Sequence, residues 1–136
     1  VFEKFIKGLE YSVDLYIDQN AKCSGIVCRR RVEITGGEST KIVSEKNNQL
    51  EKLALQISNY FNITGPANIQ FIKKNDKYFF MEINPRIAGG IMNTIASGLD
   101  IPDLMIKEIL NKKFKKFKFR KIKTIKYFKE HHELYN

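Results

Sequence analysis

The chain has 136 residues, of which 43% are hydrophobic, and it carries a formal net charge of +9. This length suffices for one ordinary domain with its own apolar core, so folding requires no disulfide. No apolar run approaches the ~18–20 residues that cross a membrane, and no signal-peptide pattern opens the chain. Length and composition therefore predict a soluble, cytoplasmic protein without a membrane partner.

Paired strands and one helix are predicted in the first half of the chain. Polar and apolar residues alternate over residues 10–18, which predicts a strand, and residues 22–33 follow as its antiparallel partner. Gly36 and Gly37 interrupt regular structure, either as a plain turn or where the backbone approaches a ligand. Over residues 47–61 apolar side chains recur every three or four positions, which predicts an amphipathic helix covering a sheet.

The two cysteines, Cys23 and Cys28, lie five positions apart in a predicted strand. Alternate residues of a strand face opposite sides, so this odd spacing predicts thiols on opposite faces. The pair forms neither a CxxC motif nor a zinc-ligand pattern. We expect two free thiols, buried or half-buried, in a reducing compartment.

A hairpin with a polar face is predicted within residues 68–90, where two runs rich in β-branched and aromatic residues flank a polar turn. Glu82 and Asn84 lie two positions apart on the second strand and share a face, while Met81 and Ile83 share the other. Gln70 on the first strand can add a third oxygen to the polar face. One carboxylate with two amide oxygens suits a hard cation such as Mg²⁺.

Arg86 follows this strand directly, after Pro85 has ended it. Its planar guanidinium matches a phosphate or a carboxylate. The four polar groups of the hairpin together indicate a phosphate and metal site. The alternative is structural, because Asn-Pro commonly starts a turn and Glu82 could be a solvated strand residue.

Beyond the hairpin, residues 88–90 (Ala-Gly-Gly) predict a flexible loop where an acceptor substrate could approach. Short helices are expected at residues 92–97 and 103–111, with Asp103 near the positive end of the second helix dipole. The predicted fold class is α+β, an antiparallel sheet with helices packed on one side. We expect a domain over residues 1–111 and a basic extension over residues 112–136 that adds strands to it.

Gln70 and the run EINPR at residues 82–86 resemble the metal-binding end of the ATP-grasp superfamily, especially members similar to the carbamoyl-phosphate synthetase large subunit. The resemblance covers roughly residues 1–110 and implies the fold of the C-terminal ATP-grasp subdomain. It also implies that Gln70, Glu82 and Asn84 hold Mg²⁺, with Mn²⁺ as a substitute. Arg86 would then contact the terminal phosphate or an acyl-phosphate.

The segment VFEKFIKGLEYSVDLYID resembles the strand, hinge and strand that follow the ATP lid in this family. This resemblance implies that Glu10 binds the ribose and that three hinge residues meet adenine, namely Glu3, Phe5 and Ile6. The run RRRVEITGGEST resembles the strand and loop that border the phosphates and the acceptor. A basic residue there contacts phosphate, and Arg29 and Arg31 are both candidates.

The resemblance implies an ATP-dependent carboxylate-amine or carboxylate-thiol ligase that forms an acyl-phosphate. ATP and a small carboxylate are the expected substrates, and the amine or thiol acceptor is not identified by the sequence. The N-terminal subdomain and most of the lid domain of the family have no counterpart in the chain. We therefore expect a fragment that is inactive alone.

The C-terminal segment, residues 112–129, contains ten basic residues and no acidic one, interleaved with aromatic and aliphatic residues. Such a segment can track nucleic acid or lie on an anionic membrane. The interpretation we favour is a set of strands with one charged, solvent-exposed face and one buried face. The buried face would be formed by Phe117, Phe119, Ile125 and Tyr127. Nucleic acid is then not an expected partner. The rival hypothesis for function is a catalytically silent module whose basic tail docks a polyanion or another subunit.

Overall fold

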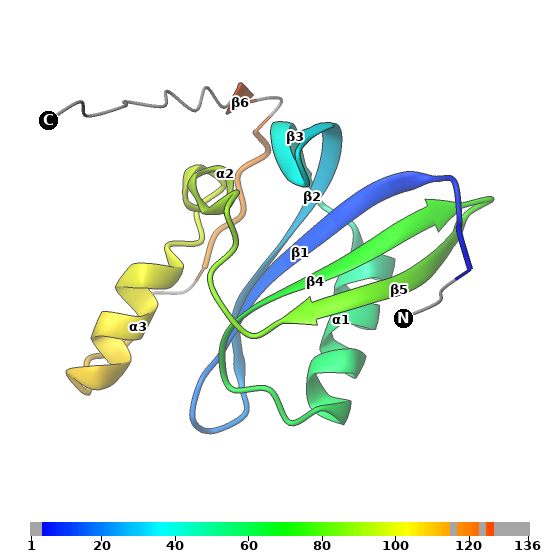
Figure 1. Ribbon diagram of the computed structural model, residues 1–136. Coiled ribbons are helices and arrows are strands. Elements are labelled where there is room, and N and C mark those ends of the chain that lie inside the picture. The colour runs from blue at the N-terminus through cyan, green and yellow to red at the C-terminus, as the bar shows by residue number, and fades with distance from the viewer. Residues whose placement is uncertain (1–3, 115–116, 123–124, 127–136) are drawn as a thin grey trace, which may run out of the picture.

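The computed structural model describes residues 4–114, 117–122 and 125–126. Its centre is a six-stranded antiparallel sheet with the strand order β5-β4-β1-β2-β3-β6 (Figure 1). The elements, in chain order, are β1 (Leu9–Ile17), β2 (Cys23–Thr35), β3 (Glu38–Glu45), α1 (Asn48–Tyr60), β4 (Gly65–Lys74), β5 (Lys77–Asn84), α2 (Ile91–Ala96), α3 (Ile101–Ile109) and β6 (Ile125–Lys126).

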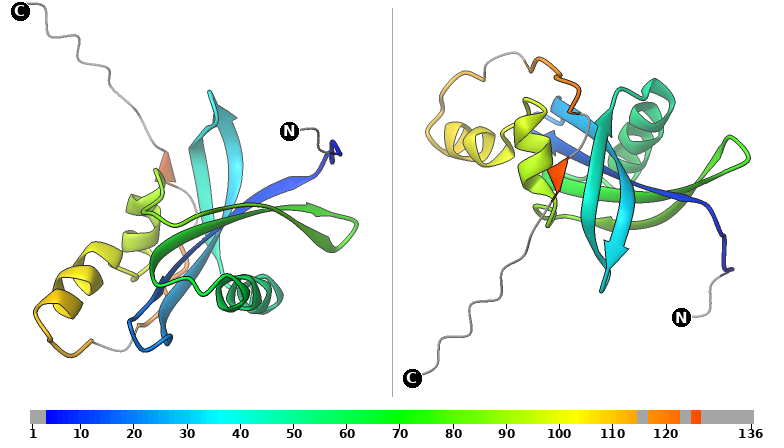
Figure 2. Two further views of the ribbon diagram at one scale, coloured as in Figure 1. Left: turned by 60° about the horizontal axis from the view of Figure 1, so that its bottom comes forward. Right: turned by 90° about the horizontal axis from the view of Figure 1, so that it is seen from above.

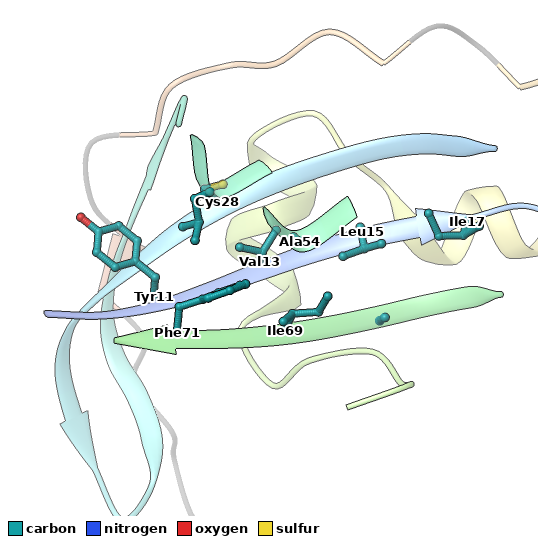
Figure 3. Close-up of a cluster of buried hydrophobic side chains, with 10 residues drawn as sticks. Tyr11, Val13, Leu15, Ile17, Cys28, Ala54, Ile69 and Phe71 are labelled. Carbon is teal, nitrogen blue, oxygen red and sulfur yellow. The ribbon is translucent and has the colours of Figure 1, made fainter. Parts of the chain in front are cut away.

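The main core lies between the sheet and α1. Alternate residues of β1 point to this side, and α1 covers them with Leu50 and Ala54 (Figure 3). The Asn47 side chain caps the helix by accepting a hydrogen bond from the Leu50 N–H at 3.1 Å. The buried members of this core are Tyr11, Val13, Leu15, Ile17, Cys28, Leu50, Ala54, Ala67, Ile69 and Phe71.

A second, smaller cluster covers one end of the opposite face. Tyr16 of β1 and Val27 of β2 are buried on an otherwise polar face, where they pack with residues of α3 and of the loop before it. Figure 2 shows α3 beside the sheet and away from α1. The buried members are Tyr16, Val27, Leu99, Ile101 and Leu104. The α+β class and the antiparallel sheet are confirmed. The expectation that the helices pack on one side is wrong, because each face carries its own apolar patch, covered by α1 on one face and by α3 on the other.

Both cysteines face the α1 side, so the prediction of opposite faces is wrong. The register between β1 and β2 shifts at Tyr16/Ile17, so that Ile17 pairs with Cys23 while Val13 pairs with Cys28. This β-bulge adds one residue and returns Cys23 to the face of Cys28. Both thiols are free, as predicted, and burial raises the pKa of each.

The described part of the basic segment runs back along the second cluster. Phe114, Phe117 and Phe119 pack against it. The Arg120 N–H donates to the Ser97 carbonyl at 2.8 Å. Phe117 and Phe119 were expected on the buried face of a strand, but they are half-buried and lie in an irregular segment. The expectation for the Ile125 side chain and for Tyr127 falls outside the described residues.

Candidate functional site

The polar face of the sheet brings functional side chains from three neighbouring strands together. Ser12 of β1 pairs with Arg29 of β2 on one side and with Gln70 of β4 on the other. Residues directly opposite in an antiparallel pair share a face, so these three side chains point the same way. The face lies opposite α1 and next to the loop that follows β5.

A cavity of about 190 Å³ opens on this face. Three arginines line it, and no acidic residue of the described chain does. Hydroxyl and amide side chains with glycine backbone complete the wall, which comprises Ser12, Arg29, Arg31, Gly37, Ser39, Asn68, Gln70, Arg86, Ala88, Gly89 and Gly90. Guanidinium groups with nearby backbone form a surface suited to phosphate or carboxylate, and we call this space the arginine cavity.

Asp14 fixes Arg29 at the base of this cavity. Arg29 Nε donates to Asp14 Oδ2 at 2.8 Å and Nη2 donates to Oδ1 at 2.9 Å, with 2% and 1% of the two side chains exposed. Asn68 Nδ2 donates to Oδ1 at 2.6 Å, and the Thr94 hydroxyl donates to Oδ2. Each carboxylate oxygen therefore accepts two hydrogen bonds, which satisfies the buried charge.

The remaining nitrogen of Arg29, Nη1, faces the loop before α2. A Cβ atom added to Gly90 would lie 2.2 Å from it, so no other residue fits at Gly90 without moving Arg29. At Gly89 an added Cβ would meet nothing within 4 Å. Of these two glycines, only Gly90 brings the loop backbone close to the guanidinium.

Arg31 is held at the opposite wall by four hydrogen bonds. Its Nε donates to Ser39 Oγ at 2.7 Å and its Nη2 donates to the Gly37 carbonyl at 2.6 Å. Nη1 donates both to Glu10 Oε2 at 2.9 Å and to Gln70 Oε1 at 2.8 Å. All three nitrogens of this guanidinium are engaged within the described structure.

The three predicted metal ligands meet at one carboxylate oxygen. Gln70 and Glu82 are direct partners across β4 and β5, and Asn84 lies two positions further on. Gln70 Nε2 donates to Glu82 Oε1 at 2.7 Å, and Asn84 Nδ2 donates to the same oxygen at 2.8 Å. The predicted spacing therefore does gather one carboxylate and two amides.

The residue types of this group suit a hard cation, but both amide nitrogens face Glu82 Oε1 in this structure, so both amides would have to turn their oxygens inward to ligate one. A carboxylate and amide oxygens are the ligands that Mg²⁺ accepts, together with phosphate oxygens and waters. Glu82 is exposed and so open to a ligand. The group contains a single carboxylate, and among the described residues no three or more His, Cys, Asp or Glu side chains are arranged to hold a metal.

Of the three arginines that line the cavity, Arg86 makes the fewest side-chain hydrogen bonds within the described structure. It is exposed, and its one side-chain hydrogen bond in the described structure goes from Nη1 to the Ile87 carbonyl at 3.2 Å. No acidic side chain of the described residues pairs with it. Arg86 can therefore bind an anion without breaking an existing ion pair.

A larger cavity of about 460 Å³ lies beside the N-terminal segment, and we call it the apolar cavity. The predicted hinge residues Phe5 and Ile6 line it together with Glu10, the predicted ribose ligand. Glu3 falls outside the described residues. Glu10 connects the two cavities, because it lines this one and pairs with Arg31, which lines the other.

The opposite wall of the apolar cavity was not predicted. It is formed by Ile72, Phe79, Phe80 and Met81. A bulge between Gln70 and Phe71 shifts the register, so that Phe71 pairs with Phe80 and Met81 loses its partner. Met81 was expected beside Ile83 on the apolar face. Ile83 does pack against the main core, but 38% of Met81 is exposed.

Among the described residues no helix has the length and apolar character needed to cross a bilayer.

Carbamoyl phosphate synthase large chains from Caldanaerobacter subterraneus and Pseudothermotoga lettingae are 28% identical to this chain over 131 and 130 residues. These alignments cover 88% of this chain and 12% of each relative. The chain therefore spans only a small part of the curated relatives it matches.

Two solved structures share the fold. Biotin carboxylase from Campylobacter jejuni superposes with a TM-score of 0.70 at 19% identity, covering 86% of this chain and 29% of that chain. The phosphoribosylaminoimidazole carboxylase ATPase subunit from Aquifex aeolicus gives 0.68 at 16% identity, covering 82% and 35%. The family model for the ATP-grasp of the biosynthetic pathway with the Ter operon matches residues 1–131. The chain belongs to the ATP-grasp family.

Proposed function

We propose that this chain forms the phosphate- and metal-binding part of an ATP-dependent ligase similar to carbamoyl phosphate synthase. The enzyme would activate a small carboxylate as an acyl-phosphate for attack by an amine or a thiol. The observation that carries the proposal is the arginine cavity, which has no acidic lining, placed beside the group formed by Gln70, Glu82 and Asn84. Membership of the ATP-grasp family supports it.

ATP would occupy both cavities. The apolar cavity offers Phe79 and Met81 on one side and Phe5 on the other, which suits a planar adenine ring. Glu10 would accept hydrogen bonds from the ribose hydroxyls. The phosphates would then extend past Glu10 and Arg31 into the arginine cavity.

Gln70, Glu82 and Asn84 would hold Mg²⁺ or Mn²⁺, which when bound neutralises charge on the phosphates. Arg86 would bind the transferring phosphoryl group, because its guanidinium makes one hydrogen bond within the described structure and has further N–H donors for a ligand. Arg29 would present Nη1 from a fixed position, because Asp14 holds its other two nitrogens. Donors that are already oriented stabilise developing charge without reorganisation during the reaction.

The acceptor side of the site would be small. The cavity of about 190 Å³ must also admit phosphate oxygens, which leaves room for a small carboxylate. Gly89 and Gly90 line it with backbone rather than side chains. The positive lining favours a carboxylate over a cationic substrate.

Glu82→Gln tests the proposal in the full-length protein. The neutral amide keeps the size of the side chain but removes the one carboxylate of the metal site, so we expect Mg²⁺-dependent ATP turnover to fall by about 100-fold or more. Circular dichroism should show an intact fold. Glu33→Gln, an exposed position on β2, is the matched control and should retain activity. Full activity of the Glu82 variant would refute the metal site.

A further inference from the structure

We infer that Ser12 is a ligand-binding residue whose hydroxyl donates a hydrogen bond to an oxygen of the transferring phosphoryl group. This inference rests on the proposed function, because it concerns the same site. It adds to that site a residue that the sequence did not single out. Ser12 belongs to β1 and lies on the floor of the arginine cavity.

The alternation of β1 places Ser12 between two ion pairs. Glu10, Ser12 and Asp14 are each two positions apart, so they share the polar face of the sheet. Glu10 Oε2 accepts from Arg31 Nη1 at 2.9 Å, and Asp14 Oδ2 accepts from Arg29 Nε at 2.8 Å. Within the described structure, Ser12 is the member of this trio that has no charged partner.

The register of the sheet places Ser12 between the anion-binding and the metal-binding parts of the site. Ser12 lies directly opposite Arg29 on β2 and directly opposite Gln70 on β4, and Gln70 lies opposite Glu82 on β5. Residues directly opposite in antiparallel strands have Cβ atoms about 4.5–5.5 Å apart. A phosphoryl group that contacts both Arg29 Nη1 and a cation beside Glu82 would therefore lie over Ser12.

The Ser12 side chain is buried, but the fold does not use its hydroxyl. Only 4% of Ser12 is exposed, and the residue lines the arginine cavity. Its side chain makes no hydrogen bond to another described residue, whereas the surrounding side chains of Arg29, Asn68 and Gln70 are each held by at least one. Burying a hydroxyl costs free energy unless it is hydrogen-bonded, so the cavity has to supply its partner.

A serine hydroxyl suits an anionic oxygen at this position. It carries one O–H donor that can turn toward a ligand, and hydrogen bonds to ionised acceptors are stronger than those between neutral groups. Arg29 Nη1 and Arg86 supply further donors, and no acidic residue of the described chain lines the cavity. These donors can therefore share one phosphoryl group with Ser12.

Ser12→Ala in the full-length protein is the main test, because it removes the hydroxyl and keeps the space. Titration calorimetry with Mg²⁺ present should show the affinity for AMP-PNP, a non-hydrolysable analogue of ATP, falling by about 10–100-fold. The affinity for ADP, which lacks the terminal phosphoryl group, should not change. Ser24→Ala is the matched control: Ser24 is a half-buried serine on the neighbouring strand β2 that lines a different cavity, so both affinities should stay unchanged.

Either of two results with Ser12→Ala would overturn the inference. One is AMP-PNP binding at the wild-type affinity. The other is an equal loss of affinity for ADP and AMP-PNP, which would separate Ser12 from the terminal phosphoryl group. Ser12→Thr and Ser12→Val add a comparison at similar volume, because the two side chains differ in the hydroxyl. Ser12→Thr should bind AMP-PNP more tightly than Ser12→Val, and equal affinities would also contradict the inference.

Inorganic phosphate gives a readout that is independent of the proposed function. Titrated into the nucleotide-free protein, it should shift the backbone amide signals of Arg86 and Gly90, which line the cavity, and should need a higher concentration to do so in Ser12→Ala. This result in a protein that binds neither ADP nor AMP-PNP would support the role of Ser12 in anion binding and refute the ligase proposal. A wild-type protein that binds neither phosphate nor nucleotide would refute both.

Discussion

Asp14 and Arg29 form the most deeply buried ion pair among the described residues, with 1% and 2% of their side chains exposed. Asp14 also accepts from Asn68 and Thr94, so it ties β2, β4 and α2 to β1 at the base of the arginine cavity. A buried charge that loses its partner is costly. The pair therefore connects the geometry of the site to the stability of the fold.

Asp14→Asn should destabilise the protein strongly, because it leaves the Arg29 charge buried without compensation. We expect the free energy of unfolding to fall by about 3–5 kcal/mol, measured by urea denaturation. Asp76→Asn is the control: Asp76 pairs with Lys73 at 3.0 Å, but 96% of its side chain is exposed, so stability should hardly change. Equal stability of the two variants would show that the buried pair contributes nothing.

Gly90→Ala should displace Arg29, whereas Gly89→Ala should leave Arg29 in place. The added methyl group at Gly90 would lie 2.2 Å from Arg29 Nη1 and displace the guanidinium, whereas the one at Gly89 meets open space. We expect roughly 10-fold or greater loss of ATP turnover in the first variant, since small displacements of positioned groups are costly. Equal turnover in both variants would argue against a role for Nη1.

At the scale of elements, α1 stabilises the fold through its apolar face. Leu50→Ala should cost about 2–5 kcal/mol in the free energy of unfolding, because this fully buried side chain would leave a cavity in the main core. Lys52→Ala, two positions further on the exposed face, should change stability by no more than about 0.5 kcal/mol. Chemical denaturation of both variants checks the difference. Similar values for the two would mean that α1 is not packed as described.

Elements with strong periodicity were predictable from the sequence. The alternation in β1 and the helical repeat in α1 predicted these elements to within about two residues at each end. The strand β3 was not predicted, because its sequence ESTKIVSE lacks regular alternation, although it forms a local hairpin with β2 in which Thr35 pairs with Glu38. The β-bulges at Tyr16/Ile17 and at Gln70/Phe71 were also missed, and they account for the errors at Cys23 and Met81.

The site was predictable where it depends on local spacing. Glu82 and Asn84 share a face because they lie two apart on one strand, and the short turn brings Gln70 opposite Glu82. The contacts around Asp14 were not predictable, since Asn68 and Thr94 lie 54 and 80 positions away from it. Only the folded sheet shows that these residues meet.

For the whole molecule, alkaline pH should reduce stability. Burial raises the pKa of Cys28 above its ordinary 9.0, and burial with nearby Glu45 raises the pKa of Tyr11 to about 12. In the unfolded chain these groups lose their protons at their ordinary values, while the folded chain retains them, so stability falls as pH rises from about 9 toward 12. Thermal melts from pH 8 to pH 11 should show a falling midpoint. Cys28→Ala should make the melting midpoint fall less steeply with pH just above pH 9. An equally steep fall would show that the Cys28 thiol does not contribute to the loss of stability.

The most direct test of the central claim is a titration of the full-length protein with ADP in the presence and absence of Mg²⁺, followed by backbone amide shifts. The account predicts saturable, Mg²⁺-dependent binding that perturbs Gln70, Glu82 and Arg86 together with Phe5 and Glu10, because the proposed nucleotide would extend from the apolar cavity into the arginine cavity beside Glu82. An intact protein that binds no nucleotide, or binds it without any dependence on Mg²⁺, would contradict the account.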